Sequence, residues 1–542
     1  MITLSELLIR DLIKQGVDTF FGVQGGACAR LIECVIKFKG KYIPVLNEQS
    51  AGFYAHGYYM ATGKTAGLIF TTGPGVTNGV TGIAACYYDR VPLITLTGQV
   101  NKSLNIAKKT KTRMVGFQEV PHLDLCSSIS DVSYKIDSPK KYLNSRLKIL
   151  QNLKSKVQII EVLDDVQRNK IPDNLGKNLI ALKKLKNFNI SKKNNELIKA
   201  SKNPIFLIGS GFVNSNKYLK LISILKRLNI KIACTWGGQR IQKNLSVKDN
   251  FIGIFGSHNP GIANKLIKQS DLIVSLGCSL LQHQVGKKHS NFAPKAKILY
   301  INNDINECKR AKLQFGKRLT ICNYELSKFV ENLKVLKKIN NNKKHDIETN
   351  IADHPVYYLK QLLKSVKKNS LIFSDAGATL SWTYQAANTV EKCPPIFTSF
   401  NLHSMGYANC ASVGAAISKQ KNIYCVIGDG SVPMNSQELS WLKKFPIKLI
   451  ILDNKGYGII RQTQRDFYKS KFYGSDFKNK NSSLPTFSVE KILNSHDILV
   501  RRMKKDNNLK NDLKWLISKK KSKALIINVK YSSTVTVEQW KD

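Results

Sequence analysis

The stretch Ile423-Tyr424-Cys425-Val426-Ile427-Gly428-Asp429-Gly430-Ser431 joins a run of apolar residues to an aspartate that stands between two glycines. A helical pattern begins near Met434, and a second apolar run at 447–452 leads into Asp453-Asn454-Lys455-Gly456-Tyr457-Gly458. Two short apolar runs on either side of a helical pattern predict a βαβ unit with neighbouring parallel strands. Polar residues then follow the carboxyl ends of both strands, where open α/β sheets bind their ligands.

The residue types that follow these two strands suit a phosphate and a divalent cation. Gly428 and Gly430 allow the backbone to approach a phosphate closely, and the start of the following helix offers unpaired N–H groups to an anion. Asp429 and Asn454 supply oxygen ligands of the kind that Mg²⁺ prefers. A single Gly-Asp-Gly is most often an ordinary turn, but a second ligand at the end of the next strand favours a site for magnesium and phosphate.

This arrangement resembles the cofactor motif of the thiamine-diphosphate-dependent enzymes, which begins with Gly-Asp-Gly and ends with an asparagine after the next strand. The resemblance implies two cofactors, thiamine diphosphate and Mg²⁺. It implies that Asp429, Asn454 and the carbonyl of Gly456 bind Mg²⁺. Contacts to thiamine diphosphate are then expected from Gly428, Gly430, Ser431, Asn454, Gly456 and Tyr457.

The same resemblance implies a glutamate that hydrogen-bonds the aminopyrimidine ring of the cofactor and promotes removal of the proton from C2 of the thiazolium. The segment Asn47-Glu48-Gln49-Ser50-Ala51 follows a predicted strand at 42–46 and resembles the family's segment, with Asn47 in place of the usual histidine. Glu48 is therefore the expected catalytic and cofactor-binding glutamate. Taken alone, a glutamate after a strand is more often a helix cap.

Three further segments continue in the order of the family. The turn at 71–78 is similar to the family's Gly-Pro-Gly turn and assigns cofactor contacts to Gly73, Pro74 and Asn78. Phe117 and Gln118 are expected at the catalytic centre. Met405, in Ser404-Met405-Gly406-Tyr407-Ala408, takes the position of the bulky apolar residue that bends the bound cofactor, although a core methionine is the alternative.

Apolar runs alternate with helical patterns along the chain and predict α/β architecture with three doubly wound parallel-sheet domains. The expected domains are an aminopyrimidine-binding domain at 1–172, a central Rossmann-like domain at 190–336 and a diphosphate- and Mg²⁺-binding domain at 350–542. Polar, lysine-rich stretches at 183–195 and 337–344 are the predicted linkers. The resemblance implies a homodimer or homotetramer in which one subunit contributes the glutamate and its partner contributes the diphosphate site.

The sequence is most similar to the acetolactate-synthase-like branch, which implies a carboligase. Such an enzyme removes CO₂ from a 2-oxo acid, here expected to be pyruvate, and transfers the two-carbon unit to an acceptor carbonyl. The segment Ser279-Leu280-Leu281-Gln282-His283-Gln284-Val285-Gly286-Lys287 lacks the arginines and aspartates of the branch, which leaves the binding of FAD open. Thr463 replaces a tryptophan of the acceptor pocket, and Asp131 replaces a lysine.

The smaller Thr463 side chain suggests a wider pocket and an acceptor such as a keto-sugar. A 2-oxo acid decarboxylase is the alternative, with His56 and His122 as single candidate histidines that are more often structural. A flavin-linked oxidase is a third enzymatic alternative. An inactive homologue is the non-enzyme alternative, and the retention of Glu48, Asp429 and Asn454 together argues against it.

The net charge of +48 raises the possibility of a nucleic-acid binder. The 85 basic residues include only 14 arginines and are spread along the chain, whereas readers of bases and phosphates favour clustered arginine. Binding to nucleic acid is therefore not expected. The 11 cysteines form no Cys-x-x-Cys pair, and no apolar run approaches the ~20 residues of a membrane helix. The beginning of the chain lacks a signal-peptide pattern, so we expect a cytoplasmic protein without a membrane partner.

Overall fold

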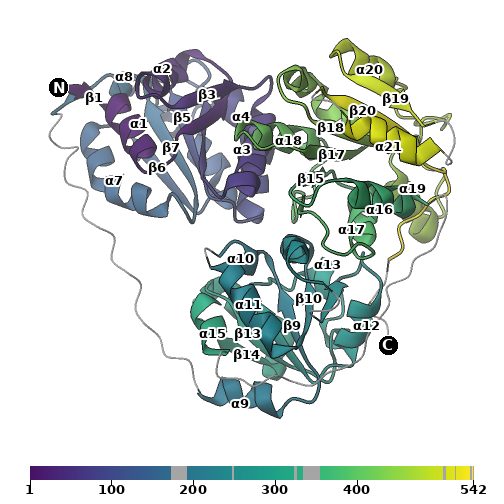
Figure 1. Cartoon of the computed structure of the whole chain (residues 1–542). Helices are drawn as coiled ribbons and strands as arrows, with labels where there is room; N and C mark the ends of the chain where they lie inside the picture. Colours follow the sequence, from purple (N-terminus) through teal and green to yellow (C-terminus); the bar gives the residue numbers. More distant parts are fainter. Residues whose placement is uncertain are drawn as a thin grey trace.

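The computed structural model describes residues 1–172, 192–215, 217–246, 250–322, 326–333, 354–503, 508–518, 521–537 and 540. Within these residues it contains three parallel sheets of six strands each, which confirms the predicted fold class. Figure 1 shows one sheet for each third of the chain, with helices on both faces. The predicted linker at 337–344 and most of the one at 183–195 lie outside the described residues, so the exact domain boundaries stay predictions.

The strands have the following bounds. The first sheet, in the order β3-β2-β4-β5-β7-β6, contains β2 (Thr19–Gly22), β3 (Lys41–Pro44), β4 (Ala66–Phe70), β5 (Leu93–Gln99), β6 (Val132–Ile136) and β7 (Val157–Leu163). The central sheet, in the order β11-β10-β9-β12-β13-β14, contains β9 (Pro204–Ile208), β10 (Lys231–Cys234), β11 (Phe251–Ile254), β12 (Leu272–Leu276), β13 (Lys297–Ile301) and β14 (Leu319–Cys322). The third sheet, in the order β16-β15-β17-β18-β20-β19, contains β15 (Leu371–Ser374), β16 (Ile396–Phe397), β17 (Ile423–Gly428), β18 (Lys448–Asp453), β19 (Leu499–Arg502) and β20 (Lys523–Asn528). A short antiparallel pair joins β1 (Ile2–Thr3) to β8 (Lys170–Ile171).

The helices cover these sheets on both sides. The first domain carries α1 (Leu4–Lys14), α2 (Ala29–Lys37), α3 (Glu48–Thr62), α4 (Pro74–Tyr88), α5 (Ala107–Thr110), α6 (His122–Leu125), α7 (Pro139–Asn152) and α8 (Asp164–Gln167). The central domain carries α9 (Lys192–Ala200), α10 (Ser210–Val213), α11 (Tyr218–Leu228), α12 (Ile262–Lys268), α13 (Gln282–Val285), α14 (Ile305–Phe315) and α15 (Leu326–Asn332). The third domain carries α16 (Pro355–Ser365), α17 (Ala378–Ala387), α18 (Tyr407–Ile417), α19 (Gly458–Thr463), α20 (Val489–Ser495) and α21 (Leu509–Ile517).

The third sheet reverses its strand order between β15 and β17. Successive strands are added on one side of β15 and then, from β17 onward, on the other side. Ligands of open α/β sheets bind at such a switch point, outside the carboxyl ends of the strands. The end of β17 is Gly428, followed directly by Asp429, so the sequence motif lies at the switch point. The helix expected from Met434 is instead a 3₁₀ segment, η9 (Asp429–Lys443), which is kinked at Asn435 and contains Pro433. Proline lacks the N–H that a regular helix would need there.

Helix α3 begins at Glu48 and lies between the first and third domains. The Asn47 side chain caps it by accepting the N–H of Gln49 at 2.9 Å, and Gly63 ends it in a left-handed conformation with φ 70°. Most of its residues are buried, because α4 packs on one side and α18 of the third domain on the other. Figure 1 shows this arrangement, with α3 and α4 turned towards α18. The helix that carries Glu48 is therefore fixed by both domains.

Glycines set the distance between α3 and its neighbours. A side chain at Gly57 would collide with the carbonyl of Ala411 in α18, and one at Gly414 would collide with the carbonyl of Tyr54. Gly52 meets Gly82 of α4 in the same way. Aromatic rings fill the space beside these contacts, as in the edge-to-face pair of Phe53 and Tyr407 with centroids 5.6 Å apart. Backbone therefore touches backbone along both crossings.

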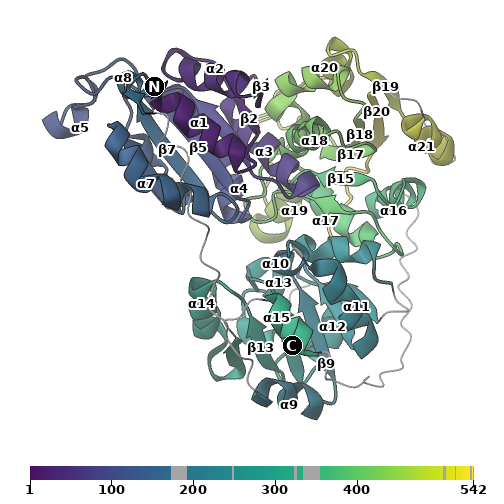
Figure 2. The same cartoon turned by 60° about the vertical axis from the view of Figure 1, so that its left-hand side comes forward.

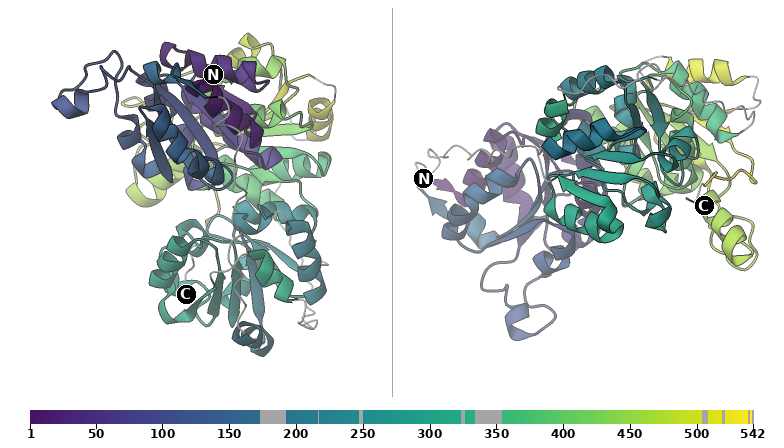
Figure 3. Two further views of the ribbon diagram at one scale, coloured as in Figure 1. Left: turned by 90° about the vertical axis from the view of Figure 1, so that its left-hand side faces the viewer. Right: turned by 90° about the horizontal axis from the view of Figure 1, so that it is seen from below.

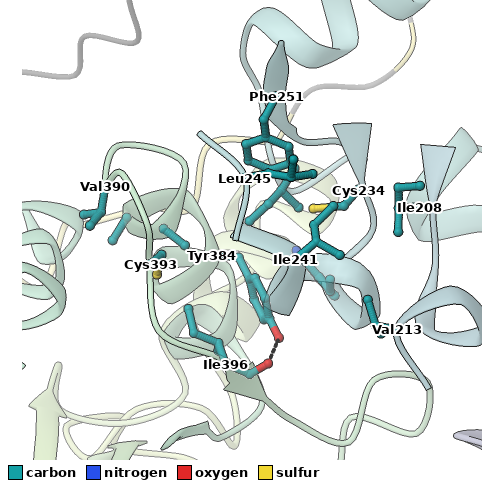
Figure 4. Packing of buried hydrophobic residues seen from close by; sticks show 14 of the residues in the cluster. Ile208, Val213, Cys234, Ile241, Leu245, Phe251, Tyr384, Val390, Cys393 and Ile396 are labelled. Carbon is teal, nitrogen blue, oxygen red and sulfur yellow. Dashed lines mark hydrogen bonds between the residues drawn. The ribbon is translucent and has the colours of Figure 1, made fainter. Parts of the chain in front are cut away.

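The central domain shares a second core with the third domain. Figure 4 shows Ile241 and Cys234 of the central domain close to Tyr384 and Ile396 of the third domain. The buried Tyr384 hydroxyl donates to the carbonyl of Ile396 at 3.1 Å, so its polar atom is satisfied within the core. Among the described residues, no helix is long and apolar enough to cross a membrane.

An arm extends from the first domain. The segment around α5 projects away from the rest of the chain in Figure 2 and in the left view of Figure 3. Phe117 follows α5 in the sequence, and its side chain is 82% exposed. Leu104, Met114 and Val115 of the same segment are also exposed, and several exposed apolar side chains together are typical of a surface that another molecule covers.

We predict that Gly57→Ala destabilises the protein by about 2–3 kcal/mol, because the added methyl group overpacks a crossing that has no space for it. Gly26→Ala is the matched control, since a side chain at Gly26 meets nothing within 4 Å. Denaturant unfolding of both variants tests this expectation. Equal stability of the two variants would show that α3 and α18 can separate at no cost.

Candidate active site

The Asp429 turn is built from backbone contacts. Asp429 is buried at 2% exposure, and its carboxylate accepts the N–H of Gly456 at 2.9 Å and that of Asn454 at 3.4 Å. The ring of Tyr457 lies against Gly430, where a side chain would come within 2.6 Å of it. The buried Arg461 guanidinium donates to the carbonyl of Asn454 at 2.7 Å and holds the loop after β18. The structure thus brings together both halves of the predicted motif.

The oxygens of this turn fit a divalent cation. One atom of the Asn454 amide lies 3.1 Å from Asp429 Oδ1 and 2.6 Å from the carbonyl oxygen of Gly456. With the amide oxygen in this place, three oxygens converge, an arrangement that a cation stabilises; with the amide rotated, its nitrogen donates to both oxygens instead. Burial, followed by the charge of Asp453, raises the pKa of Asp429 to about 6. A bound cation would favour the charged carboxylate.

The donor set of the turn points to a hard cation. Asp453 turns away from the turn and pairs with Lys455 at 2.7 Å and Arg502 at 2.8 Å. No group of three or more His, Cys, Asp or Glu that could hold a metal occurs in the described parts of the chain. The remaining donors are one carboxylate, one amide and one carbonyl. Such an all-oxygen set, completed by phosphate and water, suits Mg²⁺.

Asp375 is a residue of this site that the sequence analysis missed. It follows β15 at the switch point, is fully buried, and accepts the N–H groups of Gly406 at 3.1 Å and Ala408 at 2.9 Å. A hydrogen bond from Ser431 also reaches it, while burial raises its pKa to about 6. One carboxylate therefore joins the Met405 loop to the diphosphate turn. The polar pair Ser374-Asp375 directly after the apolar run at 371–373 was the available signal.

Met405 lies in a loop with a defined backbone. Gly406, which follows it, adopts a left-handed conformation with φ 73° and is the N-cap of α18. Met405 is half-buried rather than part of the core, since it belongs to none of the buried clusters of the described residues. Its role at the cofactor stays a prediction.

Glu48 and Asn78 meet in the first domain. The Glu48 carboxylate is 7% exposed and accepts a hydrogen bond from the Asn78 amide at 3.1 Å. Gly73 has a φ of 68°, begins the turn before Pro74 and lies against the backbone of Gln118, itself at φ 62°. The Thr72 hydroxyl donates to the carbonyl of Gln118 at 2.9 Å. The structure thus gathers Glu48 with Asn78 and Gly73 with Gln118, while the Phe117 side chain extends into solvent.

Glu438 links the Asp429 segment to the junction that carries Glu48 within one chain, and was not expected. It is buried in η9 and accepts the N–H of Leu46 at 2.8 Å and the Tyr54 hydroxyl at 2.7 Å. Burial raises its pKa. The strand-to-helix junction that carries Glu48 is therefore held by the same segment that begins with Asp429.

The two histidines considered for a decarboxylase are part of the buried framework. His56 lies 3.0 Å from Asp89 through Nε2 and 2.7 Å from the Tyr407 hydroxyl through Nδ1. His122 contacts Glu161 through Nδ1 at 3.0 Å and accepts the N–H of Gly73 through Nε2 at 3.0 Å. Both ring nitrogens of each residue are thus engaged with the protein.

The switch point of the central sheet does not fit the diphosphate of FAD. It lies between β9 and β12, where the N–H of Gly209 donates to Leu276 at 3.0 Å and that of Gly211 donates to Gly277 at 3.2 Å. A side chain on Gly209 would collide with the carbonyl of Gly277, so the two turns are in contact. These N–H groups are already bonded and are not offered to a dinucleotide.

Asp131 has a local structural role. Its carboxylate accepts the N–H of Val157 at 2.8 Å, and its own N–H donates to the Val157 carbonyl at 2.9 Å. The side chain therefore secures the approach of β6 to β7.

Comparison with known proteins gives matches along the whole chain. Models of the thiamine pyrophosphate enzyme match in three places: the N-terminal TPP binding domain at residues 2–121, the central domain at 192–316 and the C-terminal TPP binding domain at 375–529. Thiamine pyrophosphate is thiamine diphosphate. A probable acetolactate synthase large subunit of Methanococcus aeolicus is 28% identical, covering 95% of this chain and 90% of that one. The acetolactate synthase isozyme 2 large subunit of Escherichia coli is 26% identical, covering 86% of each.

A solved structure supports the fold. The thiamine diphosphate-dependent 4-hydroxybenzoylformate decarboxylase of Rhodococcus jostii RHA1 superposes with a TM-score of 0.79 at 15% identity, covering 98% of this chain and 100% of that one. At this identity the likeness concerns the architecture of the chain, which has the same three-domain organisation.

We predict that Asp375→Asn weakens the binding of thiamine diphosphate by about tenfold or more, because an amide cannot accept all the hydrogen bonds that the carboxylate accepts. Asp497→Asn is the control, since Asp497 is an exposed partner of Lys443 in the same domain. Titration of the cofactor by protein fluorescence gives both affinities. Unchanged affinity in Asp375→Asn would mean that the Met405 loop is positioned without Asp375.

Proposed function

Because the chain belongs to the thiamine pyrophosphate enzyme family and to its acetolactate-synthase-like branch, we propose that it decarboxylates pyruvate and transfers the two-carbon unit to an acceptor carbonyl. The observation that carries the proposal is the convergence of Asp429, Asn454 and Gly456 at the switch point of the third sheet. That arrangement suits Mg²⁺ and a diphosphate. An inactive homologue would not need to retain Glu48, Asp429 and Asn454 together.

Different residues of the chain have different roles in the proposed reaction. Asp429, Asn454 and the Gly456 carbonyl would hold Mg²⁺, and Met405 would support the bent cofactor. Glu48, buried and bonded by Asn78, would hold or release a proton at its carboxylate oxygen beside the aminopyrimidine ring. When bound, thiamine diphosphate supplies the carbon nucleophile and accepts the electron pair released with CO₂. The protein contributes placement and protection from water.

We propose a homodimer or homotetramer in which Glu48 of one subunit serves the diphosphate site of its partner. The exposed apolar side chains support this. Phe117 is 82% exposed and Leu46, two residues before Glu48, is 62% exposed. The arm around α5 projects from the first domain (Figure 2), where a second copy of the chain could contact it.

Thr463 is proposed to line one side of the acceptor pocket. This half-buried residue of α19 donates its hydroxyl to the carbonyl of Ile459 at 3.0 Å, so the hydroxyl is engaged within the helix. The neighbouring Gln462 exchanges two hydrogen bonds with Val535, at 2.9 and 2.8 Å. Position 463 therefore lies on a helix that is held in place, and the size of its side chain determines how much space is left beside α19. We propose that the reaction proceeds without FAD.

We predict that pyruvate, thiamine diphosphate and Mg²⁺ with the pure protein yield CO₂, detected together with the coupled product by mass spectrometry. Glu48→Gln should lower the rate of CO₂ release by about 100-fold or more, since it removes the proton-transferring group, while the cofactor still binds. Glu33→Gln, at an exposed position of α2, is the control. Full activity of Glu48→Gln would refute the assigned role of Glu48.

We predict that Thr463→Trp lowers kcat/KM for a bulky acceptor by about tenfold relative to pyruvate as acceptor, because the indole fills the space beside α19. Thr463→Val, which keeps the size and removes only the hydroxyl, should leave the preference unchanged. Competition between two acceptors, analysed by mass spectrometry, measures the ratio directly. The same acceptor preference in Thr463→Trp and the parent would place the pocket elsewhere.

A further inference from the structure

Three histidines gather around one tryptophan at the boundary of the central and third domains. The ring of Trp236 stacks on His283 at 5.5 Å between centroids and on Tyr384 at 5.4 Å. His403 meets the indole edge-to-face at 5.7 Å, and His258 lies 6.0 Å from it. His283 and His403 are themselves 6.1 Å apart. We call His258, His283 and His403 the imidazole cluster.

The imidazole cluster lies at the carboxyl edge of the central sheet and beside the proposed cofactor site. His258 follows β11, and His283 belongs to α13, which follows β12. His403 precedes Met405 by two residues in the loop before α18. Carboxyl ends of parallel strands are the usual place for ligands. The cluster is thus positioned between a ligand-binding edge and the residue that would support the cofactor.

The surroundings of the imidazole cluster favour the uncharged form of its rings. Burial lowers the pKa of His283 to about 3, with the neighbouring His403 and His258 acting in the same direction. Burial likewise lowers the pKa values of His258 and His403. A neutral imidazole offers one N–H donor and one acceptor nitrogen. Such rings suit hydroxyl and carbonyl groups and offer no positive charge to a carboxylate.

Part of the hydrogen-bonding capacity of the cluster is not used by the protein, although His283 Nε2 lies 3.2 Å from the Gln284 amide nitrogen. His258 Nδ1 and the neighbouring Asn259 Nδ2 are buried without a partner, and no hydrogen bond to the His403 ring occurs within the described residues. His56 and His122, in contrast, use both ring nitrogens in contacts with the protein. Buried polar groups are normally paired, so unpaired ones in a functional region point to a missing ligand.

The surroundings hold the cluster in place. Trp540, buried at 4% exposure, donates to the carbonyl of Gln284 at 3.1 Å and so fixes α13 from behind. The Gln385 amide of α17 donates to the carbonyl of His258 at 2.9 Å. The indole N–H of Trp236 donates to Asn259. The segments that carry His258 and His283 are therefore held in place by neighbouring elements.

We propose that the imidazole cluster binds the acceptor substrate, and that this acceptor is an uncharged, polyhydroxylated ketone or aldehyde of the sugar class rather than a second 2-oxo acid. The proposal rests on the carboligase function proposed above and names its substrate class. The acceptor hydroxyls would bond His258, His283 and Asn259. The bond from the carbonyl carbon of pyruvate to its carboxylate breaks and releases CO₂. A new bond joins that carbon to the acceptor carbonyl carbon, whose oxygen takes up one proton, so no oxidant or reductant is needed.

The test separates acceptor binding from decarboxylation. His283→Phe and His258→Phe keep a flat ring and remove both ring nitrogens, and His289→Phe is the matched control in the same domain, outside the cluster. Saturation-transfer NMR with dihydroxyacetone and erythrulose measures binding to the protein loaded with thiamine diphosphate and Mg²⁺, without turnover. Release of CO₂ from pyruvate alone and the KM for each acceptor are measured in parallel.

We expect both cluster variants to lose the saturation-transfer signal and to raise the KM for the hydroxylated acceptor by about tenfold. Their CO₂ release from pyruvate and their affinity for thiamine diphosphate should stay within about twofold of the parent protein, as should every property of His289→Phe. If the hydroxylated probes bind but pyruvate releases no CO₂, the acceptor site is supported and pyruvate is refuted as the donor.

Three results would overturn the inference. The first is that the parent protein binds neither probe. The second is that the variants slow CO₂ release with no change in KM for the acceptor, which would assign the imidazoles to proton transfer. The third is flavin fluorescence in the supernatant of the denatured protein, since a flavin would occupy this edge of the central sheet.

Discussion

The close crossing of α3 with α4 and α18 is the constraint on which the candidate site depends. Backbone meets backbone at Gly52, Gly57 and Gly414, so these helices have one possible separation. Glu48 begins α3, and Met405 precedes α18, so the positions of both are set by that crossing. Close-packed interiors transmit small displacements rather than absorb them. Each chain thus couples, through its own interior, the segment that carries Glu48 to the segment that carries Met405, which in the proposed oligomer serve two different active sites.

Buried carboxylates fix the loops next to these helices. Asp375 and Glu438 each accept hydrogen bonds from a distant segment of the chain. Asp375 thereby holds the loop before α18, and Glu438 holds the junction before α3. Burial raises the pKa of both groups, because removal from water disfavours the charged carboxylate. A carboxylate that is retained under these conditions is stabilised by its donors. Loops with no regular structure of their own thus acquire fixed positions.

Local sequence patterns predicted the residues that lie in contiguous motifs. Asp429, Asn454 and Gly456 stand at the ends of two adjacent strands, so a βαβ reading alone brings them together. Asp375 and the imidazole cluster could not be found in that way. His258, His283 and His403 come from three separate loops, and only the packing of the central domain on the third domain makes them neighbours. The segment η9 is not the expected regular helix, because it contains Pro433 and the backbone at Asn435 is not helical.

The position of Trp540 has a consequence for biosynthesis. Its side chain belongs to a cluster that otherwise consists of residues of the central domain, from Ile205 to Leu319. During translation that cluster lacks one large member until the entire third domain has left the ribosome. Contacts between residues so distant in the sequence form late in folding. The packing of the central domain is thus expected to be completed only after the third domain has been synthesised.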